Sequence, residues 1–591
     1  MLFSTFSKAL EELEQLSSRL DMTERLAQLF EALSVDELAP ATYLMQGSLV
    51  PTYESLEFQL STKMVLRALA RTKNTFSVGS EVTLFGQQDT TAAEKELQKR
   101  YKKQGDVGAV AAEWVSGSDS KHTLLHVFEQ LRAVARASGS GSQEVKVALL
   151  VSLLDSVDAT SAKFIARIII GKVRLGFSAM TMLDALSWSV CGDKSHRTLL
   201  EEAYQKQADV GQLARTYLAD RDTSRDYPEK VLAQYTVSVG VPVVPALCHR
   251  LNTSQEIIDK MGEVIAEPKY DGLRVQIHFN RNGFEDGETV RAYTRNLEDV
   301  THMFPELAVL QTVTKAETLI LDTEAIGFDV ETGALLPFQE TITRKRKHNI
   351  ASVSESVPIK FFVFDVLYRD GIVFIEMPLR DRKDVLDNLF TENRTFDVAE
   401  FITTKNPDTL REYHEEQLAK GLEGAVIKKI DAHYQSGRKG WKWVKIKEEE
   451  GTSGKLKDTL DVVVMGYFSG RGKRSQFGIG ALLVGVLDAQ TETIKTIAKI
   501  GTGLSEKRLV ELKSICDKLR APEKPSTYQV DASLVPDVWT HPSLVIEVAA
   551  DEITRSPNHT AKVALRFPRL MTVREDKSWQ DATTIEELSS L

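Results

Sequence analysis

The sequence predicts a multidomain chain with an all-α part, an α+β part and a β-rich part, in that order. The chain has 591 residues, which is enough for about three to four domains with separate cores. Apolar residues recur at three- and four-residue spacing up to about residue 220. Strand-like runs then alternate with helical segments, and short strands between glycine-rich turns dominate the end.

Residues 1–222 are expected to form the all-α domain. Within them Gln104-Gly-Asp106-Val-Gly108 is echoed by Gln207-Ala-Asp209-Val-Gly211, which favours a duplicated half-domain over coincidence. Each Asp-Val-Gly precedes a helical pattern, and free backbone N–H groups at a helix start can bind a phosphate. These two helix starts are therefore candidate contacts with a nucleic-acid backbone.

Residues 223–246 read as a linker, because Pro228, Pro242 and Pro245 interrupt the helical pattern. Residues 247–450 read as the α+β domain. The expected strands there are 290–294, 319–321, 359–367, 425–428 and 443–446, and the expected helices are 379–389 and 407–420.

Residues 451–591 read as a β-rich domain with strands at 460–466, 480–487, 494–500 and 543–549 and one helix near 506–519. About five strands and a helix suit an OB-fold barrel, and any small β-barrel is the alternative. The basic turn Arg471-Gly-Lys-Arg474 is placed to lie on a phosphate backbone.

The segment Glu267-Pro-Lys269-Tyr-Asp-Gly-Leu-Arg274 lies between two apolar runs, 264–266 and 275–279. Lys269 stands at the end of an expected strand, beside an Asp-Gly turn, where a lysine can act as a nucleophile. Alone, the motif fits an ordinary hairpin turn equally well.

Further motifs follow along the chain. In order they are Tyr293-Thr-Arg295-Asn296, Leu321-Asp-Thr-Glu324, Phe361-Phe-Val-Phe364-Asp365, Glu423-Gly-Ala-Val-Ile-Lys428, Trp443-Val-Lys445-Ile-Lys447 and Arg574-Glu-Asp576-Lys577. This series resembles the motifs of the covalent nucleotidyltransferases, and it is most similar to the ATP-dependent DNA ligases of the archaeal and eukaryotic replicative type. The resemblance extends over essentially the whole chain.

The resemblance implies a helical DNA-binding domain, an adenylation (nucleotidyltransferase) domain and an OB-fold domain. It implies an enzyme that seals 5′-phosphate, 3′-hydroxyl nicks in duplex DNA through lysyl-AMP and DNA-adenylate, in replication, repair and recombination. An RNA ligase or a GTP-dependent capping-type nucleotidyltransferase is the enzymatic alternative, and a DNA-binding clamp without catalysis is another. The large helical domain argues against the first, and the retained motif residues argue against the second.

Lys269 is the expected nucleophile toward the α-phosphate of ATP. A lysine of ordinary pKa is neutral in only about one molecule in 2,000 at pH 7, so it must lose its proton to react. Arg274, Lys445 and Lys447 are the cations expected to lower its pKa and to neutralise charge on the phosphoryl oxygens.

The resemblance implies roles for the remaining site residues. Glu324 and Glu423 are expected on the side of a Mg²⁺ ion, which takes oxygen ligands and shares them with phosphates, and Glu324 is alternatively expected at the ribose hydroxyls. Phe364 is expected to stack on adenine, and Glu267 and Arg295 to contact the nucleotide.

The last motif, Arg574, Asp576 and Lys577, is expected to orient pyrophosphate during adenylation and then to move away, as a lid does.

One position departs from the family pattern. The family has an arginine six residues before Lys445, where this chain has Lys439, with Arg438 one residue earlier. A lysine holds a phosphate as a point charge but not bidentately, so the sequence leaves open which of the two contacts ATP.

Charge and cysteine content agree with this reading in part. The net charge is −10, so affinity for nicked duplex DNA must come from local clusters such as Arg344-Lys-Arg-Lys347 and the cations between 424 and 447. Cys191, Cys248 and Cys516 lack Cys-x-x-Cys spacing, which predicts neither a zinc site nor disulfides, and makes NAD the least favoured main donor. We expect a monomer in the cytoplasm with no membrane segment. Minor use of ADP or NAD and recruitment by a sliding clamp are left open.

Overall fold

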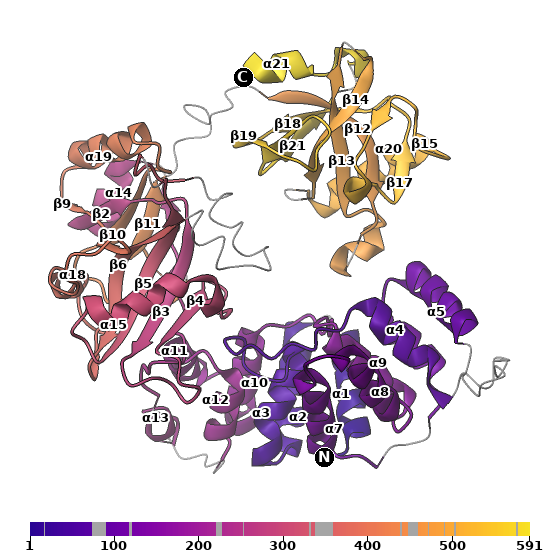
Figure 1. Cartoon of the computed structure of the whole chain (residues 1–591), viewed down its shortest axis with the longest axis horizontal. Coiled ribbons are helices and arrows are strands. Elements are labelled where there is room, and N and C mark those ends of the chain that lie inside the picture. The colour runs from indigo at the N-terminus through magenta and orange to yellow at the C-terminus, as the bar shows by residue number, and fades with distance from the viewer. Residues whose placement is uncertain are drawn as a thin grey trace. The chain divides into compact units, whose positions relative to one another are not determined.

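The computed structural model describes residues 1–16, 18–73, 90–117, 121–219, 227–233, 235–251, 253–329, 332–336, 358–437, 440–446, 459–470, 472–489, 491–501, 504–574 and 577–590. The chain forms two compact units, Met1–Ile446 and Lys447–Leu591. Figure 1 labels the elements of both units.

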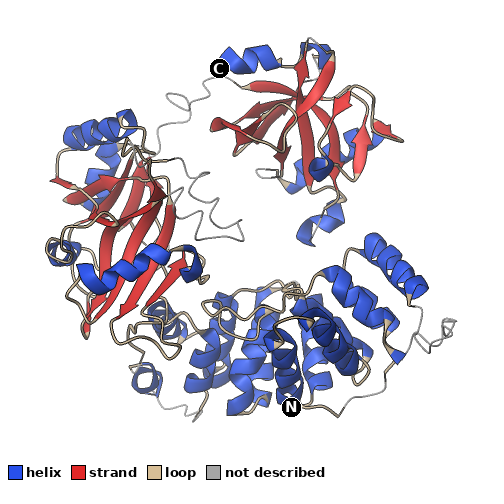
Figure 2. Cartoon of the chain, in the orientation of Figure 1, coloured by secondary structure: helices blue, strands red, loops and turns tan. Residues whose placement is uncertain are grey.

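Helices form the N-terminal part of the first unit, as predicted (Figure 2). Ser61, Thr123 and Asp158 cap three of them by accepting hydrogen bonds from main-chain N–H groups at 3.0–3.4 Å. The apolar faces of the helices share one core, which runs from Phe3 to Tyr235. The helices are α1 (Phe3–Gln15), α2 (Arg19–Ala32), α3 (Val35–Gln46), α4 (Thr62–Ala70), α5 (Thr91–Gln104), α6 (Val107–Trp114), α7 (Leu124–Arg136), α8 (Ser142–Leu154), α9 (Ala159–Ile169), α10 (Ala179–Cys191), α11 (Arg197–Lys206), α12 (Val210–Tyr217) and α13 (Tyr227–Leu232).

The two repeated Asp-Val-Gly segments start α6 and α12, and in both the aspartate caps its own helix. The N–H of Gly108 donates to Asp106 Oδ1 at 2.9 Å, and the N–H of Gln212 donates to Asp209 Oδ1 at 2.9 Å. Asp106 is also ion-paired with the buried Arg167. The expectation that these helix starts offer free N–H groups is therefore wrong for Gly108 and Gln212.

Packing explains the glycine of each repeat. A Cβ on Gly108 would lie 2.6 Å from Cγ of Arg167, and a Cβ on Gly211 would lie 2.5 Å from the ring of Tyr43. Each glycine thus admits a large side chain against the first turn of its helix. The duplication of the half-domain stays a prediction.

Two sheets form the rest of the first unit. The six-stranded sheet has the order β4-β3-β5-β6-β7, with β8 paired to β6, and the five-stranded sheet has the order β1-β11-β10-β2-β9. The bounds of the strands are β1 (His249–Leu251), β2 (Val264–Pro268), β3 (Leu273–Asn280), β4 (Val290–Thr294), β5 (Thr318–Gly327), β6 (Ile359–Arg369), β7 (Ile372–Val373), β8 (Phe396–Val398), β9 (Ile402–Thr404), β10 (Ala425–Lys429) and β11 (Trp443–Ile446).

Helices α14 (Ser254–Met261), α15 (Leu310–Val313), α18 (Leu379–Leu386) and α19 (Pro407–Ala419) pack on these sheets. Ile257 of α14 and Leu410 of α19 share a core with the five-stranded sheet, and Leu310 and Leu386 share the core of the six-stranded sheet. The predicted mixture of strands and helices is confirmed.

Part of the predicted linker packs on the six-stranded sheet. Val243 exchanges two hydrogen bonds with the side chain of Gln276, at 2.8 and 3.1 Å. Val237, Val243 and Ala246 are buried with Ile320 of β5. The boundaries of the domains stay predictions, because the two compact units do not separate the helical part from the sheets.

The second unit is β-rich. Its main sheet follows the path β15-β17-β12-β13-β14-β16, with β18 paired to β12 and β21, and β19 pairs with β20. Across the residues described in this unit, the pairings form an open sheet rather than a closed barrel. The elements are β12 (Leu460–Phe468), β13 (Ala481–Asp488), β14 (Thr493–Ile500), β15 (Arg520–Ala521), β16 (Tyr528–Gln529), β17 (Val538–Thr540), β18 (Val545–Ala549), β19 (Glu552–Arg555), β20 (Val563–Arg566), β21 (Arg569–Val573), α20 (Glu506–Lys518) and α21 (Ile585–Ser590).

Arg474, from the predicted phosphate-binding turn, binds main-chain carbonyls instead. Its Nη1 donates to the Gly480 carbonyl at 2.8 Å and to the Gly501 carbonyl. It thereby joins the start of β13 to the end of β14. Arg471 lies outside the described residues.

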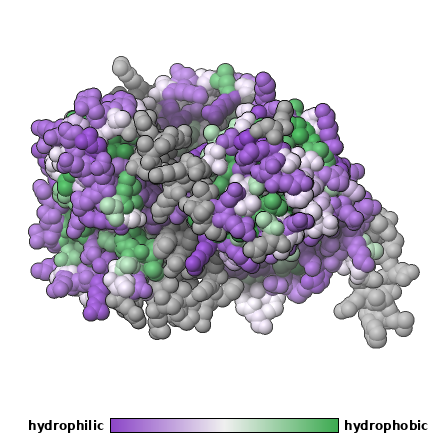
Figure 3. Space-filling view, turned by 90° about the horizontal axis from the view of Figure 1, so that it is seen from above, coloured by the Kyte–Doolittle hydropathy of each residue, from purple (hydrophilic) through white to green (hydrophobic). Residues whose placement is uncertain are grey.

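Hydrophilic residues cover much of the face seen in Figure 3, with smaller hydrophobic areas between them. Within the described parts of the chain, no helix combines the length and the apolar character needed to cross a membrane.

Candidate active site

Lys269 follows β2 directly and is held by main-chain hydrogen bonds to the turn before β10. Its N–H donates to the Gly424 carbonyl at 2.8 Å, and its carbonyl accepts from the Glu423 N–H at 3.1 Å. The Lys269 Nζ forms an ion pair with the Glu423 carboxylate. Two residues predicted from motifs more than 150 positions apart therefore lie in direct contact.

The turn that carries Glu423 requires a glycine at the next position. Gly424 has a φ of 104°, in the region that favours glycine. A Cβ at this position would lie 2.3 Å from Cε1 of His414, a buried residue of α19. The conformation of the chain and the space beside it thus both exclude a side chain next to Glu423.

A cavity of about 640 Å³ opens beside Lys269. Small-molecule sites in proteins typically occupy roughly 300–1,000 Å³, so the cavity has the size of a nucleotide site. Seven of the residues predicted for the site line it, namely Glu267, Lys269, Arg274, Arg295, Glu324, Phe364 and Lys445.

Arg274 and Glu324 lie opposite each other on the antiparallel strands β3 and β5. The guanidinium of Arg274 binds the carboxylate of Asp322 through two nitrogens, at 3.0 and 2.5 Å, and the Ala246 carbonyl through a third, at 2.5 Å. Arg274 is therefore fixed in one orientation by groups behind the cavity wall. Asp322, its partner, is fully buried and was not predicted as a site residue.

Glu324 has an unusual electrostatic environment. Burial raises the pKa of its carboxyl group to about 7, although Arg274 and Lys269 act in the opposite direction. The desolvation of the carboxyl group therefore changes its pKa more than the charges of Arg274 and Lys269 do. A carboxyl group titrating near neutrality in a cavity is a common feature of functional sites.

Phe364 presents its ring to three groups around the cavity. The Lys428 Nζ lies 4.5 Å from its centroid, the Arg274 guanidinium carbon lies 5.4 Å away, and the ring of Trp443 meets it edge-on at 6.0 Å. Lys428 also lies 4.2 Å from the centroid of Trp443. Cations at these distances interact favourably with aromatic faces, and they fix the position of Phe364 in the cavity wall.

Glu267 is 3% exposed and is shared by two buried lysines. Lys428 approaches its Oε2 at 2.6 Å, and Lys383 of α18 forms an ion pair with its Oε1. Both lysines also donate to the Phe364 carbonyl, at 3.4 and 3.0 Å. Lys383 belongs to no motif of the series, so nothing in the sequence distinguished it from a surface lysine of a charged helix.

Four cations lie near the thiol of Cys248, which lines the cavity. Burial raises the pKa of the Cys248 thiol, and the charges of Arg274, Lys428, Lys269 and Lys445 act to lower it. All four therefore lie close enough to influence one group in the wall. Such a concentration of positive charge suits phosphate groups.

The other predicted residues are placed as follows. Lys445, on β11, pairs in register with Val426 of β10, and Arg295 follows β4 directly and is exposed. Arg438, Lys439 and Lys447 lie outside the described residues, as do Asp576 and the cluster 344–347. The choice between Arg438 and Lys439 as the ATP contact therefore stays open.

Arg574 and Lys577 belong to the second unit, where they share one carboxylate. Arg574 Nη1 lies 3.2 Å from Asp461 Oδ1, and Lys577 Nζ lies 2.6 Å from Asp461 Oδ2. Asp461 stands on β12 and was not predicted. The two cations of the last motif thus lie together, on a unit separate from the one that contains the cavity.

A metal ion would find carboxylates rather than a complete set of protein ligands. Within the described residues, no cluster of three or more His, Cys, Asp or Glu side chains is arranged to hold a metal. Glu423 contacts Lys269, and Glu324 lies within electrostatic range of the same lysine. Mg²⁺ commonly binds one or two carboxylates together with substrate phosphates, and this pair fits that arrangement.

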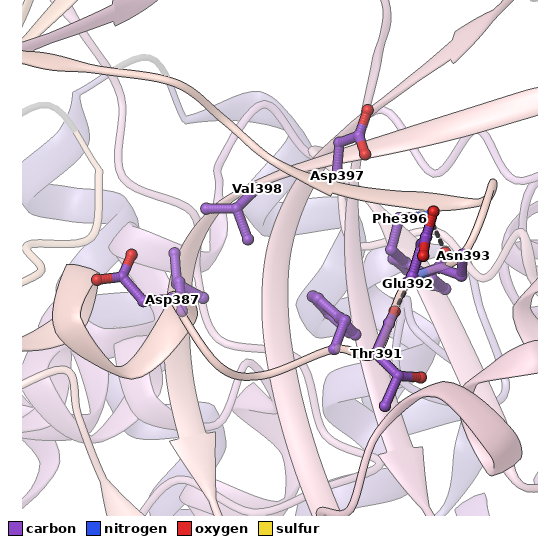
Figure 4. Close-up of a pocket in the computed structure, with 9 residues that line it drawn as sticks. Asp387, Thr391, Glu392, Asn393, Phe396, Asp397 and Val398 are labelled. Carbon is purple, nitrogen blue, oxygen red and sulfur yellow. Dashed lines mark hydrogen bonds between the residues drawn. The ribbon is translucent and has the colours of Figure 1, made fainter.

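A second, smaller cavity of about 230 Å³ lies beside the end of α18 and β8. Figure 4 shows Asp387, Glu392 and Asp397 around it. Its lining contains no lysine or arginine, so it offers no positive charge to a phosphate, and none of the predicted site residues borders it.

Comparison with known proteins identifies the family. The description "ATP dependent DNA ligase domain" matches residues 245–447, "DNA ligase N terminus" matches 2–187, and "ATP dependent DNA ligase C terminal region" matches 475–577. The "Probable DNA ligase" of Dictyoglomus turgidum is 38% identical over 100% of this chain and 97% of its own length. This chain belongs to the ATP-dependent DNA ligases.

Archaeal relatives agree with this assignment. "DNA ligase 2" of Thermofilum pendens is 34% identical over 99% of this chain and 96% of its own length, and "DNA ligase 1" of Methanosarcina barkeri is 34% identical over 94% and 98%. The solved structure "Pmar-Lig_PreS3" has a TM-score of 0.53 and 14% identity, over 96% of the ligase and 99% of that chain, and it supports the fold alone.

These findings confirm the predicted family and an enzyme that uses ATP to join DNA. The rival readings, an RNA ligase, a GTP-dependent capping enzyme and an inactive clamp, are not supported. The ligase has the predicted helical N-terminal, central nucleotidyltransferase and C-terminal regions.

Proposed function

We propose that the ligase seals 5′-phosphate, 3′-hydroxyl nicks in duplex DNA through a lysyl-AMP at Lys269 and a DNA-adenylate. The observation that carries this proposal is the position of Lys269, between the carboxylate of Glu423 and a cavity bordered by Arg274 and Lys445. A nucleophile and a set of phosphate-binding cations are thereby brought together.

In the first step the deprotonated Lys269 Nζ attacks the α-phosphorus of ATP. A P–N bond forms, the bond to the β-phosphate oxygen breaks, and pyrophosphate leaves. Glu423, in contact with Nζ, is the group placed to receive the proton of the lysine. The 5′-phosphate of the nick then takes the AMP and frees Lys269, and the 3′-hydroxyl displaces AMP to complete the phosphodiester.

The cavity wall supports a role for each remaining residue. Phe364 is proposed to stack on adenine, because its ring borders the cavity. Glu267 and Arg295 are proposed to contact the nucleotide, and Arg274 and Lys445 to lie against its phosphates. Lys439 and Lys447 are proposed as phosphate contacts on the strength of the family pattern.

Glu324 and Glu423 are proposed to hold Mg²⁺, and Glu324 is alternatively proposed to bind the ribose hydroxyls. The metal would supply positive charge to the phosphates during transfer. The role of the two glutamates is to orient that charge next to Lys269.

Arg574, Asp576 and Lys577 are proposed to act in the first step as part of a mobile lid. Their location on the second compact unit supports a group that approaches the nucleotide and then withdraws. The β-strands and the helix α20 of that unit support an OB-type fold, although the described pairings are open.

Broader roles follow from the family. We propose a helical DNA-binding domain at 1–222, a linker at 223–246, an adenylation domain at 247–450 and an OB-type domain at 451–591. We further propose service in replication, repair and recombination, as a monomer. The sequence and the structure leave recruitment by a sliding clamp open.

Substitution of the nucleophile tests the proposal. Lys269→Ala should abolish transfer of label from α-labelled ATP to the protein, assayed by denaturing electrophoresis, while binding of nicked DNA is retained. Lys260→Ala is the matched control, because Lys260 is a partly exposed lysine that pairs with Glu256 on α14. Label on the Lys269→Ala protein would contradict the assignment of the nucleophile.

A further inference from the structure

A buried cluster of charge borders the cavity at Glu267 and Lys428. Lys383 and Lys428, with side chains 3% and 1% exposed, both contact the single carboxylate of Glu267. Buried ammonium groups are stable only where they are paired and hydrogen-bonded. Glu267 and the Phe364 carbonyl supply partners for both lysines.

The cluster joins two sheets. Glu267 is on β2 of the five-stranded sheet, and Phe364 is on β6 of the six-stranded sheet. The Nζ of Lys383, from α18, contacts both at once. Lys383 therefore fixes the carboxylate of Glu267 relative to the backbone that carries Phe364.

The positions of Glu267 and Lys383 relative to the cavity differ. Glu267, Phe364 and Lys428 line the cavity, whereas Lys383 does not. A substitution at position 383 therefore acts on a bound base only through Glu267 and Phe364, without removing a lining group.

A carboxylate in the cavity wall distinguishes adenine from guanine and hypoxanthine by the group at the 6-position of the purine ring. Adenine presents an amino group there, which donates hydrogen bonds, and guanine or hypoxanthine presents a carbonyl oxygen, which accepts them. An ionised carboxylate attracts the first and repels the second. An ammonium group has the opposite preference, so adenine is favoured only while the carboxylate of Glu267, rather than the ammonium of Lys428, is presented to the base.

We propose that Lys383 is a positioning residue that sets the preference of the ligase for adenine. It holds the carboxylate of Glu267 toward the 6-position and fixes it relative to the backbone of Phe364. Without Lys383, the carboxylate of Glu267 has one buried cation in place of two, and it turns toward Lys428. This change moves the acceptor that favours adenine out of place. The inference rests on the proposed binding of ATP in this cavity.

Self-adenylation with two nucleotides tests the inference. ATP and ITP are compared because they differ at the 6-position and both lack the 2-amino group of guanine. For Lys383→Met, the ratio of kcat/KM for ATP to that for ITP should fall by about tenfold or more, since a site built to bind a polar group discriminates strongly only while that group is correctly placed. Lys383→Arg, which keeps the charge, should restore most of the ratio.

Lys360→Met is the matched control, because Lys360 is on the same strand as Phe364 but pairs with Asp397 at 2.8 Å, at the border of the smaller cavity. Its ratio should equal that of the unmodified ligase. Lys383→Gln gives a second neutral variant where Lys383→Met does not fold.

The outcomes separate the two proposals. If the unmodified ligase forms no lysyl-AMP with ATP, the proposed function fails. If it does so, but the Lys383 variants lose activity equally with ATP and ITP or keep the original ratio, the inference fails while the proposed function stands. Failure of all three Lys383 variants to fold would also overturn it, since Lys383 would then serve stability rather than selection of the base.

Discussion

Replacement of Glu324 by glutamine should stabilise the ligase at alkaline pH while it removes activity. The carboxyl pKa of Glu324 is raised from 4.5 to about 7 by burial. The folded protein therefore binds this proton more tightly than the unfolded chain does. The contribution of Glu324 to the free energy of unfolding is greatest below pH 4.5, decreases as the pH rises to about 7, and stays at its low value above that.

The magnitude follows from the shift. A difference between 4.5 and about 7 is about 2.5 pKa units, and one unit corresponds to about 1.4 kcal/mol, so the ionised form costs at most about 3.5 kcal/mol. Glu324 borders an open cavity and is partly exposed, so screening reduces this, and we expect about 1 to 3 kcal/mol. Glutamine keeps the shape and an acceptor for the Gly272 N–H but carries no charge.

Thermal unfolding of both proteins at pH 5 and at pH 8.5 measures this effect. A change of about 1 kcal/mol in the free energy of unfolding shifts the Tm of a domain of about 150–250 residues by about 2–4 °C. The Tm of Glu324→Gln should exceed that of the unmodified ligase by several degrees at pH 8.5 and by a clearly smaller amount at pH 5, where the glutamate ionises only in the unfolded chain. Self-adenylation should be lost at both pH values, because we propose that the ionised carboxylate binds the metal or the ribose.

Glu317→Gln serves as the control, because Glu317 is an exposed residue just before β5 whose carboxylate lies 3.3 Å from Arg281. It should show no such pH-dependent gain. Equal differences in Tm at the two pH values for Glu324→Gln would refute the reasoning, since the ionisation of Glu324 would then play no part in stability.

Two further predictions concern the other parts of the chain. The double variant Arg574→Ala, Lys577→Ala should lose self-adenylation and still seal a nick supplied already adenylated; equal loss in both assays would place the two residues in fixed catalytic machinery. Removal of residues 1–233 should leave lysyl-AMP formation intact but reduce nick sealing at least about tenfold, because contacts with the phosphates of the duplex are lost. Sealing at the full-length rate in moderate salt would show that the helical region is not the main DNA contact.

The sequence indicated which residues would lie near one another where short motifs stand on or beside strands, and the roles of these residues stay predictions. Lys269 follows β2 directly, Glu423 precedes β10, and Glu324 and Phe364 stand on neighbouring strands of one sheet. Pairing of β2 with β10 brings Glu423 into contact with Lys269, and Lys269, Glu324 and Phe364 line the same cavity. The resemblance of the motif series to the covalent nucleotidyltransferases, rather than the strands themselves, indicated a common site.

The residues that position these groups were not predictable in the same way. Lys383 and Asp461 act through partners far away in the sequence, and their neighbours show no pattern that sets them apart from surface charges. The helix starts at Asp106 and Asp209 were read as phosphate sites because helix geometry alone does not reveal that a cap already occupies the N–H groups. Burial and tertiary partners decide such cases.

The main-chain hydrogen bonds between Lys269 and the 423–424 turn decide which parts of the reacting complex stay in place during the cycle. The N–H and the carbonyl of Lys269 are both hydrogen-bonded to the turn before β10, so the Cα of the lysine is held in place. Only the four methylene groups of its side chain let the amine move. Successive substrates must therefore come to the lysine in turn. Under the proposed lid mechanism, the large displacements of the cycle fall to the substrates and to the unit that carries Arg574, and we expect their arrival and departure to set the turnover rate.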